Sequence, residues 1–202
     1  NDPKKANTVK YNAIYQKLEA YGKEASVSSA VSMAGDFHTN VITGAGLQAL
    51  VRGVVKYKKR DCFAILQQFV TRDIDGKICI LYGLRRTGKT TLLFQMISEL
   101  PVEQTAYIKV KTTDNMSILT KDLDVLRKKG CKYVFIDEIT LMEDFINTAA
   151  VLSDIFAMMG MKIVVSGTDS LGFAMANRDE LYDRSVTIHT SFIPFREYSR
   201  LL

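Results

Sequence analysis

The chain has 202 residues, of which 47% are hydrophobic, and a formal net charge of +5. This length and composition suit one folded domain with an appendage, and the modest positive charge fits a nucleotide or nucleic-acid partner without requiring one. The three cysteines have no CxxC spacing, and only two histidines could assist them, which argues against a zinc site. Because no apolar run could cross a bilayer and scattered thiols suit a reducing compartment, we expect a cytoplasmic protein with no membrane partner.

Residues 1–55 differ in pattern from the rest of the chain. Residues 9–22 have apolar side chains at helical spacing and end at a glycine, which predicts a helix. Residues 26–46 are rich in Ser, Gly and Thr and predict a loop, with the closing GAG as a turn. We therefore expect a small, mostly helical amino-terminal extension over residues 1–55 and a core over residues 56–202.

Strands and helices alternate through the predicted core. Apolar runs predict strands over residues 77–82, 105–110, 131–136, 161–166 and 185–190. Helical spacing predicts helices over residues 62–70, 88–100, 117–129, 143–159 and 171–182. Short strands that are apolar on both faces are typical of a parallel sheet covered by helices. Ligands of such α/β folds bind beyond the carboxyl ends of the strands.

A phosphate-binding motif joins the first core strand to the next helix. The segment GLRRTGKT matches G-x-x-x-x-G-K-[ST] without deviation. The candidate nucleotide-binding residues are Gly83, Leu84, Arg85, Arg86, Thr87, Gly88, Lys89, Thr90 and Thr91. The glycines allow close backbone approach, so that loop amides and the helix start can face phosphate oxygens. Lys89 is expected to reach the β- and γ-phosphates, and Thr90 to bind Mg²⁺. Arg85 and Arg86 could add charge over the triphosphate or point to solvent or a neighbouring chain.

A pair of acids follows the third core strand. In YVFIDEI, four apolar residues end in Asp137 and Glu138, which places both carboxylates at the carboxyl end of the strand. Asp137 suits a direct or indirect Mg²⁺ ligand, and Glu138 suits the base that polarises an attacking water. The alternative is two acids that open a surface loop. The guanine-recognising NKxD element is absent, which favours ATP over GTP.

Two further candidates lie later in the chain. Ser166 and Thr168 end the fourth core strand, where a hydroxyl could touch the γ-phosphate or the attacking water; the alternative is a helix cap. Arg184 precedes the fifth strand and could reach the nucleotide of a neighbouring subunit, stabilising transition-state charge. A surface arginine paired with Asp183 or Glu180 explains that position nearly as well.

The order of five segments resembles the prokaryotic AAA+ ATP-binding proteins of unassigned role. These segments are GLRRTGKTTLL, YVFIDEIT, VVSGTDSLGFA, LYDRSVTIHT and IPFREY. The resemblance covers about residues 56–202 and implies an AAA+ type P-loop NTPase fold with five parallel strands in the order 5-1-4-3-2. It also implies sensor duty for residues 166–168 and a trans-acting Arg184, hence a homo-oligomer. A separate carboxyl-terminal region is expected after Leu202.

The function expected from these motifs is Mg²⁺-dependent ATP hydrolysis coupled to a conformational change. One alternative is a regulatory switch that binds ATP and turns over slowly. A second is a DNA-associated ATPase, supported by the positive charge and the KYKKR run at residues 56–60; a protein partner is equally open. A third is a small-molecule kinase, for which no acceptor pocket or lid is visible in the sequence.

Overall fold

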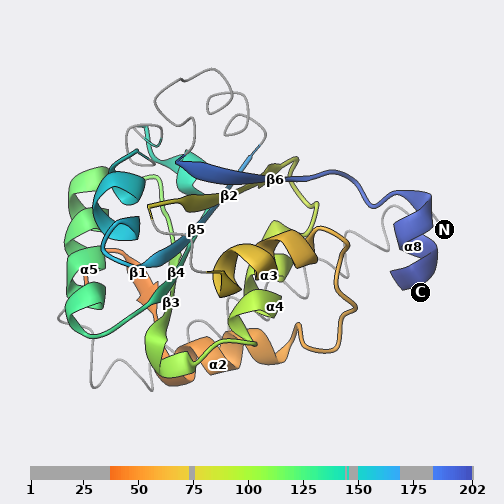
Figure 1. Cartoon of the computed structure of the whole chain (residues 1–202), viewed down its shortest axis with the longest axis horizontal. Coiled ribbons are helices and arrows are strands. Elements are labelled where there is room, and N and C mark those ends of the chain that lie inside the picture. The colour runs from red at the N-terminus through yellow and green to blue at the C-terminus, as the bar shows by residue number, and fades with distance from the viewer. Residues whose placement is uncertain (1–36, 73–75, 144, 146–149, 169–183, 202) are drawn as a thin grey trace.

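The computed structural model describes residues 37–72, 76–143, 145, 150–168 and 184–201. These residues form a sheet with helices on both faces (Figure 1). The strands are β1 (Asn40–Ile42), β2 (Ile78–Gly83), β3 (Thr105–Lys109), β4 (Tyr133–Asp137), β5 (Lys162–Gly167) and β6 (Ser185–Thr190). The α-helices are α2 (Gly44–Arg52), α3 (Phe63–Thr71), α4 (Lys89–Ile97), α5 (Met116–Lys128) and α8 (Phe195–Leu201). Shorter pieces are the 3-10 turns η1 (Val102–Gln104) and η2 (Ile139–Leu141) and the π-helical η3 (Leu152–Ala157).

The six strands have the order β1-β3-β4-β5-β2-β6. The five expected strands are all present and parallel, and their predicted order 5-1-4-3-2 is confirmed. The expectation of a sheet with only five strands is wrong, because β1 pairs antiparallel with β3, Val41 opposite Ile108. Three residues are too few to show the alternation that identifies a strand from sequence. The free edge of β3 supplies the backbone partners that make β1 a strand.

The glycine-rich end of the predicted loop is also helical. Gly44 and Gly46 begin α2 instead of forming a turn, and α2 packs against α4 and β3. Burial of Leu47, which is 1% exposed, outweighs the poor helix propensity of the glycines. The helices predicted over residues 9–22 and 171–182 lie outside the described residues.

Alternate strand residues face two separate apolar clusters, as expected for strands buried on both sides. One face packs on α5 and η3, and the other on α2, α3 and α4 (Figure 1). On β2, for example, Ile78 and Ile80 face the first cluster, whereas Cys79 and Leu81 face the second. All four side chains are 0% exposed. The buried sheet therefore fixes the edge at which β2, β4 and β5 end together.

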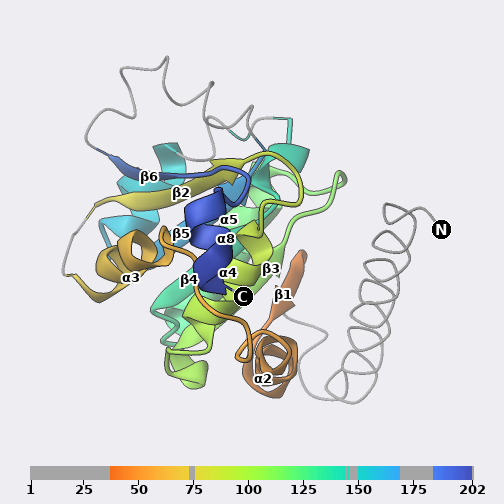
Figure 2. The same ribbon diagram turned by 90° about the vertical axis from the view of Figure 1, so that its right-hand side faces the viewer.

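The carboxyl-terminal helix α8 stands apart from this layered body. It follows β6 after a connecting segment and lies to one side of the sheet (Figure 1), in the foreground when seen from that side (Figure 2). Phe195 and Tyr198 on this helix are 83% and 49% exposed. None of the helices among the described residues has the length and apolar character that crossing a bilayer requires.

Candidate functional site

The phosphate-binding motif forms the turn between β2 and α4. Gly83 has φ +151°, and a Cβ there would collide with the backbone oxygen and the hydroxyl of Thr190 on β6. Gly88 has φ +90° and is the N-cap of α4, and apart from its chain neighbours no residue comes within 4 Å of where a Cβ would lie. Gly83 is therefore required by close backbone packing and Gly88 by its left-handed conformation. The space beside the start of α4 suits an anion, because the first amides of a helix point outward there.

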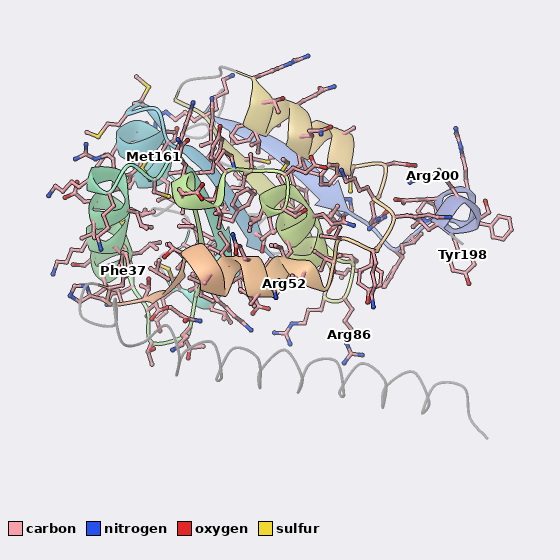
Figure 3. The ribbon with its side chains drawn as sticks, turned by 90° about the horizontal axis from the view of Figure 1, so that it is seen from below. Phe37, Arg52, Arg86, Met161, Tyr198 and Arg200 are labelled. Atoms are coloured by element: carbon pink, nitrogen blue, oxygen red, sulfur yellow. The ribbon has the colours of Figure 1, made fainter. Side chains whose placement is uncertain are left out.

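The remaining loop residues divide into anchored and exposed groups. The Lys89 ammonium donates to the carbonyl oxygens of Gly83 and Leu84, at 2.8 and 2.7 Å, so it lies across the loop. Arg85 and Arg86 are exposed, as is Leu84, and Arg86 extends away from the surface in Figure 3. Thr91 is half-buried in the first turn of α4. Lys89 is thus next to the space at the helix start, whereas the two arginines line the outside of the loop.

Asp137 at the end of β4 accepts four hydrogen bonds from four different residues. Its Oδ2 accepts from the hydroxyls of Thr90 at 2.8 Å and Tyr107 at 2.9 Å. Its Oδ1 accepts from the Ser166 hydroxyl and from the backbone N–H of Glu138, the latter at 3.1 Å. Asp137 is 2% exposed, and a buried carboxylate needs hydrogen-bond donors in place of the water that it has lost. The motif residue Thr90 and the acidic strand therefore meet, although they are 47 residues apart.

Glu138 follows Asp137 with a left-handed backbone. Its φ is +61°, its backbone N–H also lies 3.3 Å from the Ser166 hydroxyl, and its side chain is exposed. Within the described residues, Glu138 and Arg86 are the two non-glycine residues with positive φ. Such conformations cost free energy and concentrate at functional sites, and both of these flank the same strand ends. The left-handed conformation follows the last residue of β4 and leaves Glu138 exposed at the carboxyl end of the strand.

The hydroxyl, carboxylate and carbonyl groups at this edge are the ligands that Mg²⁺ prefers. Thr90 and Asp137 are close enough to bind one ion together, and Tyr107 and Ser166 also donate to the Asp137 carboxylate. The residues present therefore fit a Mg²⁺ ion held by Thr90 and Asp137. Of the two hydroxyl candidates, Ser166 on β5 donates to Asp137, whereas Thr168, just after β5, donates its backbone N–H to the Thr140 hydroxyl at 3.4 Å.

Three residues at this site were not predicted from the sequence. Tyr107 lies in an apolar strand and is 3% exposed, so the sequence marks it only as a core residue. The Thr190 hydroxyl lies 2.8 Å from that of Thr87 in the motif loop and donates to the Tyr82 carbonyl at 3.0 Å. Arg60 donates to the Thr87 carbonyl at 2.9 Å. Each contact joins segments that are distant in sequence, so no local sequence pattern predicts it.

Arg184 lies at the opposite edge of the sheet. It precedes β6, which runs parallel to β2 with Ser185 opposite Ile78 and Thr190 opposite Gly83. At about 3.3 Å per strand residue, this places Arg184 roughly 20 Å from the motif loop of its own chain. Its guanidinium pairs with Asp154 at 3.1 Å and is 44% exposed. The surface ion pair is thus present with Asp154, while Asp183 and Glu180 lie outside the described residues.

The basic run at residues 56–60 makes contacts within the chain. Lys59 pairs with Glu99, and Arg60 pairs with Glu197 at 2.9 Å. Lys58 donates to the carbonyl oxygen of Arg200 at 3.2 Å. These cations are therefore used to attach neighbouring segments to one another, and the positive charge of the run is partly neutralised.

Known proteins resemble the chain in sequence and in fold. It is 27% identical over 139 residues to uncharacterized protein MJ1544 of Methanocaldococcus jannaschii, covering 64% of this chain and 31% of that protein. In fold it resembles S. cerevisiae Hsp104 in an extended casein complex, with TM-score 0.56, 14% identity, and coverage of 80% of this chain and 31% of Hsp104. The S. cerevisiae Hsp104–ADP complex gives TM-score 0.53 at 15% identity, covering 76% of this chain and 24% of Hsp104.

The chain thus spans about a third or less of the length of these proteins. The AAA domain family matches residues 75–199, which include the motif loop, both acids and Ser166. These comparisons support a nucleotide-binding ATPase with an α/β P-loop fold of AAA+ type. The chain belongs to the AAA domain family.

Proposed function

We propose that this protein binds ATP with Mg²⁺ where β2, β4 and β5 end, and hydrolyses it there. The observation that carries the proposal is the hydrogen bond of 2.8 Å from the Thr90 hydroxyl to Asp137. It joins the phosphate-binding loop to the acidic strand in the pairing that a metal–nucleotide complex requires. The absence of NKxD from the sequence favours ATP over GTP.

Each group has a role that follows from its chemistry. Lys89 and the amides at the start of α4 bind the phosphates. Thr90 and Asp137 hold Mg²⁺, which supplies positive charge that offsets charge on the phosphates. Glu138 accepts a proton from the attacking water, for which its exposed, strained position beyond β4 is suited. Ser166 positions Asp137 and the backbone of Glu138.

Arg184 lies too far from the site of its own chain to take part there. We propose that it acts on the nucleotide of a neighbouring copy, which requires a homo-oligomer. Its half-exposed position before the edge strand β6 is compatible with such a contact. ATP hydrolysis would then depend on assembly of the oligomer. In such an assembly, hydrolysis at one site would be coupled to a conformational change of the neighbouring copies.

The test is a titration of the purified protein with ATP and with GTP, each with Mg²⁺. We expect ATP to bind the wild-type protein more tightly than GTP. Lys89→Ala should weaken ATP binding by roughly two orders of magnitude, because a charged donor to the phosphates is lost. Lys121→Ala, an exposed lysine on α5, is the matched control and should bind like wild type. Equal ATP affinity in Lys89→Ala and wild type would refute the proposed site.

A further inference from the structure

Arg60 lies at the junction of three segments that are distant in the sequence. Its Nη1 donates to the carbonyl oxygen of Thr87 in the phosphate-binding loop at 2.9 Å and to that of Ser191, just after β6, at 3.0 Å. Its Nε and Nη2 donate to the two carboxylate oxygens of Glu197 on α8, at 3.1 and 2.9 Å. One guanidinium therefore holds the loop, the end of β6 and α8 together.

The Arg60–Glu197 pair is buried and specific. The Arg60 and Glu197 side chains are 11% and 4% exposed. The guanidinium binds the carboxylate in the bidentate geometry that only arginine provides. Glu197 also accepts from the backbone N–H of Asp61 at 2.9 Å. Removing either partner would leave a buried charge without compensation, so the two side chains act as a unit.

This ion pair is the main attachment of α8 to the body. Across residues 195–201, all of them described, Glu197 is the one buried residue. The other hydrogen bonds to α8 are exposed: Arg200 donates to the Asp61 carboxylate at 2.7 Å and to the Lys59 carbonyl at 2.8 Å, and its own carbonyl oxygen accepts from Lys58 at 3.2 Å. Figure 3 shows Arg200 and Tyr198 on α8, which is set apart from the sheet. The position of α8 thus depends on polar contacts rather than on apolar packing.

The contact with Thr87 also sets the direction of a phosphate-facing amide. The described chain has no cis peptide bond, so the C=O of Thr87 and the N–H of Gly88 point in opposite directions across one planar peptide. Because Arg60 holds that C=O, the N–H of Gly88 points away from Arg60, at the N-cap of α4. Peptide amides at this point of the loop are the groups that bind phosphate.

We propose that Arg60 is a positioning residue for the phosphate-binding loop, and that its pair with Glu197 couples nucleotide binding to the attachment of α8. This inference rests on the proposed function, since it assigns a regulatory connection to the same nucleotide site. Coupling of this kind is reciprocal: if an attached α8 orders the loop for ATP, bound ATP must strengthen the attachment of α8 by the same factor.

The first experiment measures ATP affinity with Mg²⁺ for wild type, Arg60→Lys and Glu197→Gln. Lysine keeps the charge but cannot bind the loop carbonyl and both carboxylate oxygens together. We expect both variants to bind ATP roughly 10-fold more weakly, the factor expected from one misdirected charge-assisted contact. Arg196→Gln, an exposed neighbour on α8, is the control and should stay within about 2-fold of wild type.

The second experiment measures hydrogen exchange in the wild-type protein with and without ATP and Mg²⁺. Bound ATP should slow exchange of the α8 amides at least several-fold, while amides of α5 on the other face of the sheet serve as the reference. In Glu197→Gln the slowing of α8 should be lost. The wild-type measurement decides the proposal even if a variant fails to fold.

The outcomes separate this inference from the proposed function. If wild type binds no ATP, both are overturned. If wild type binds ATP and Lys89→Ala does not, the function stands, and the inference is then judged by its own measurements. ATP affinity unchanged in both Arg60→Lys and Glu197→Gln, or α8 exchange unchanged by ATP in wild type, would overturn it.

Discussion

Tyr107 on β3 donates its phenolic hydrogen to Asp137 on the neighbouring strand β4, at 2.9 Å. The ring packs against Phe94 of α4, with centroids 5.0 Å apart, so the phenol is held in place by the core. A residue that belongs to the apolar interior therefore fixes the orientation of the carboxylate proposed to hold Mg²⁺. This relationship leads to the first prediction.

Tyr107→Phe should lower the free energy of unfolding by about 1 kcal/mol, because one buried hydrogen bond is lost without a change of shape. It should also raise the Mg²⁺ concentration needed for half-maximal ATP turnover several-fold, since Asp137 is held less firmly. Denaturant unfolding and turnover at varied Mg²⁺ measure the two effects. Tyr133→Phe, on β4 and half-buried, is the control; an effect of equal size there would contradict the assigned role of Tyr107.

Ser166→Ala should reduce ATP turnover about 10-fold or more while changing ATP affinity less than about 3-fold. The Ser166 hydroxyl donates to Asp137 and lies 3.3 Å from the backbone N–H of Glu138. Its loss should therefore disturb these two acids and leave the phosphate-binding loop unchanged. Steady-state turnover and ATP titration separate these quantities. Thr105→Ala is the matched control, because this buried hydroxyl donates to the carbonyl oxygen of Pro101 at 2.8 Å, at the other end of the sheet. A loss of binding equal to the loss of turnover in Ser166→Ala would contradict the assignment.

Arg184 gives a prediction about assembly. Arg184→Ala should lower ATP turnover but leave ATP binding unchanged, because Arg184 lies outside the site of its own chain. Mixing inactive Lys89→Ala with Arg184→Ala should restore part of the activity, since Lys89→Ala supplies an intact arginine to an intact neighbouring site. Recovery is measured as turnover against the mixing ratio. No recovery at any ratio, with oligomers present, would contradict action in trans.

Much of this site could be predicted from the sequence because its signals are local. The glycines, Lys89 and Thr90 stand in one short motif, and Asp137 and Glu138 end one apolar run. Their meeting follows from parallel strands ending at one edge, and the described structure has Thr90 in contact with Asp137. The prediction of five parallel strands was correct for the same reason, since each strand is a continuous apolar run.

The unpredicted parts all depend on contacts between distant segments. The strand β1 exists because β3 offers it an edge and because Asp122 on α5 anchors the two residues before it. Arg60 looks like part of a basic surface run, yet its partners Thr87, Ser191 and Glu197 lie 27 to 137 residues away in the sequence. Residue type and spacing in the sequence do not predict which distant residues will pair.

Asp122 gives a prediction about pH. It is fully buried and accepts hydrogen bonds from the backbone N–H groups of His38 and Thr39, from the Thr39 hydroxyl at 2.6 Å and from the His38 ring. Burial alone raises the pKa of Asp122, but the bonds from Thr39 and His38 together outweigh it and hold the pKa below its ordinary value of 3.8. A depressed pKa means that the stabilisation is present above the ordinary value and is lost as pH falls through the folded-state value.

Asp122→Asn should therefore cost about 2 kcal/mol of unfolding free energy at neutral pH, and the difference from wild type should shrink below about pH 3.8. Denaturant unfolding across a pH series measures this dependence. Asp124→Asn, whose exposed carboxylate pairs with Arg127 and Lys128 on the same helix, should cost little. A constant difference down to the lowest pH would contradict the anchoring role of the Asp122 charge.

The most direct test of ATP hydrolysis at this site is single-turnover hydrolysis by Glu138→Gln, with ATP binding measured on the same sample. Glutamine keeps the shape of the side chain but cannot accept the proton of the attacking water. We expect binding within about 3-fold of wild type and a hydrolysis rate at least about 100-fold lower, with Glu143→Gln, an exposed acid nearby, behaving as wild type. A hydrolysis rate in Glu138→Gln equal to that of the wild-type protein would contradict the account.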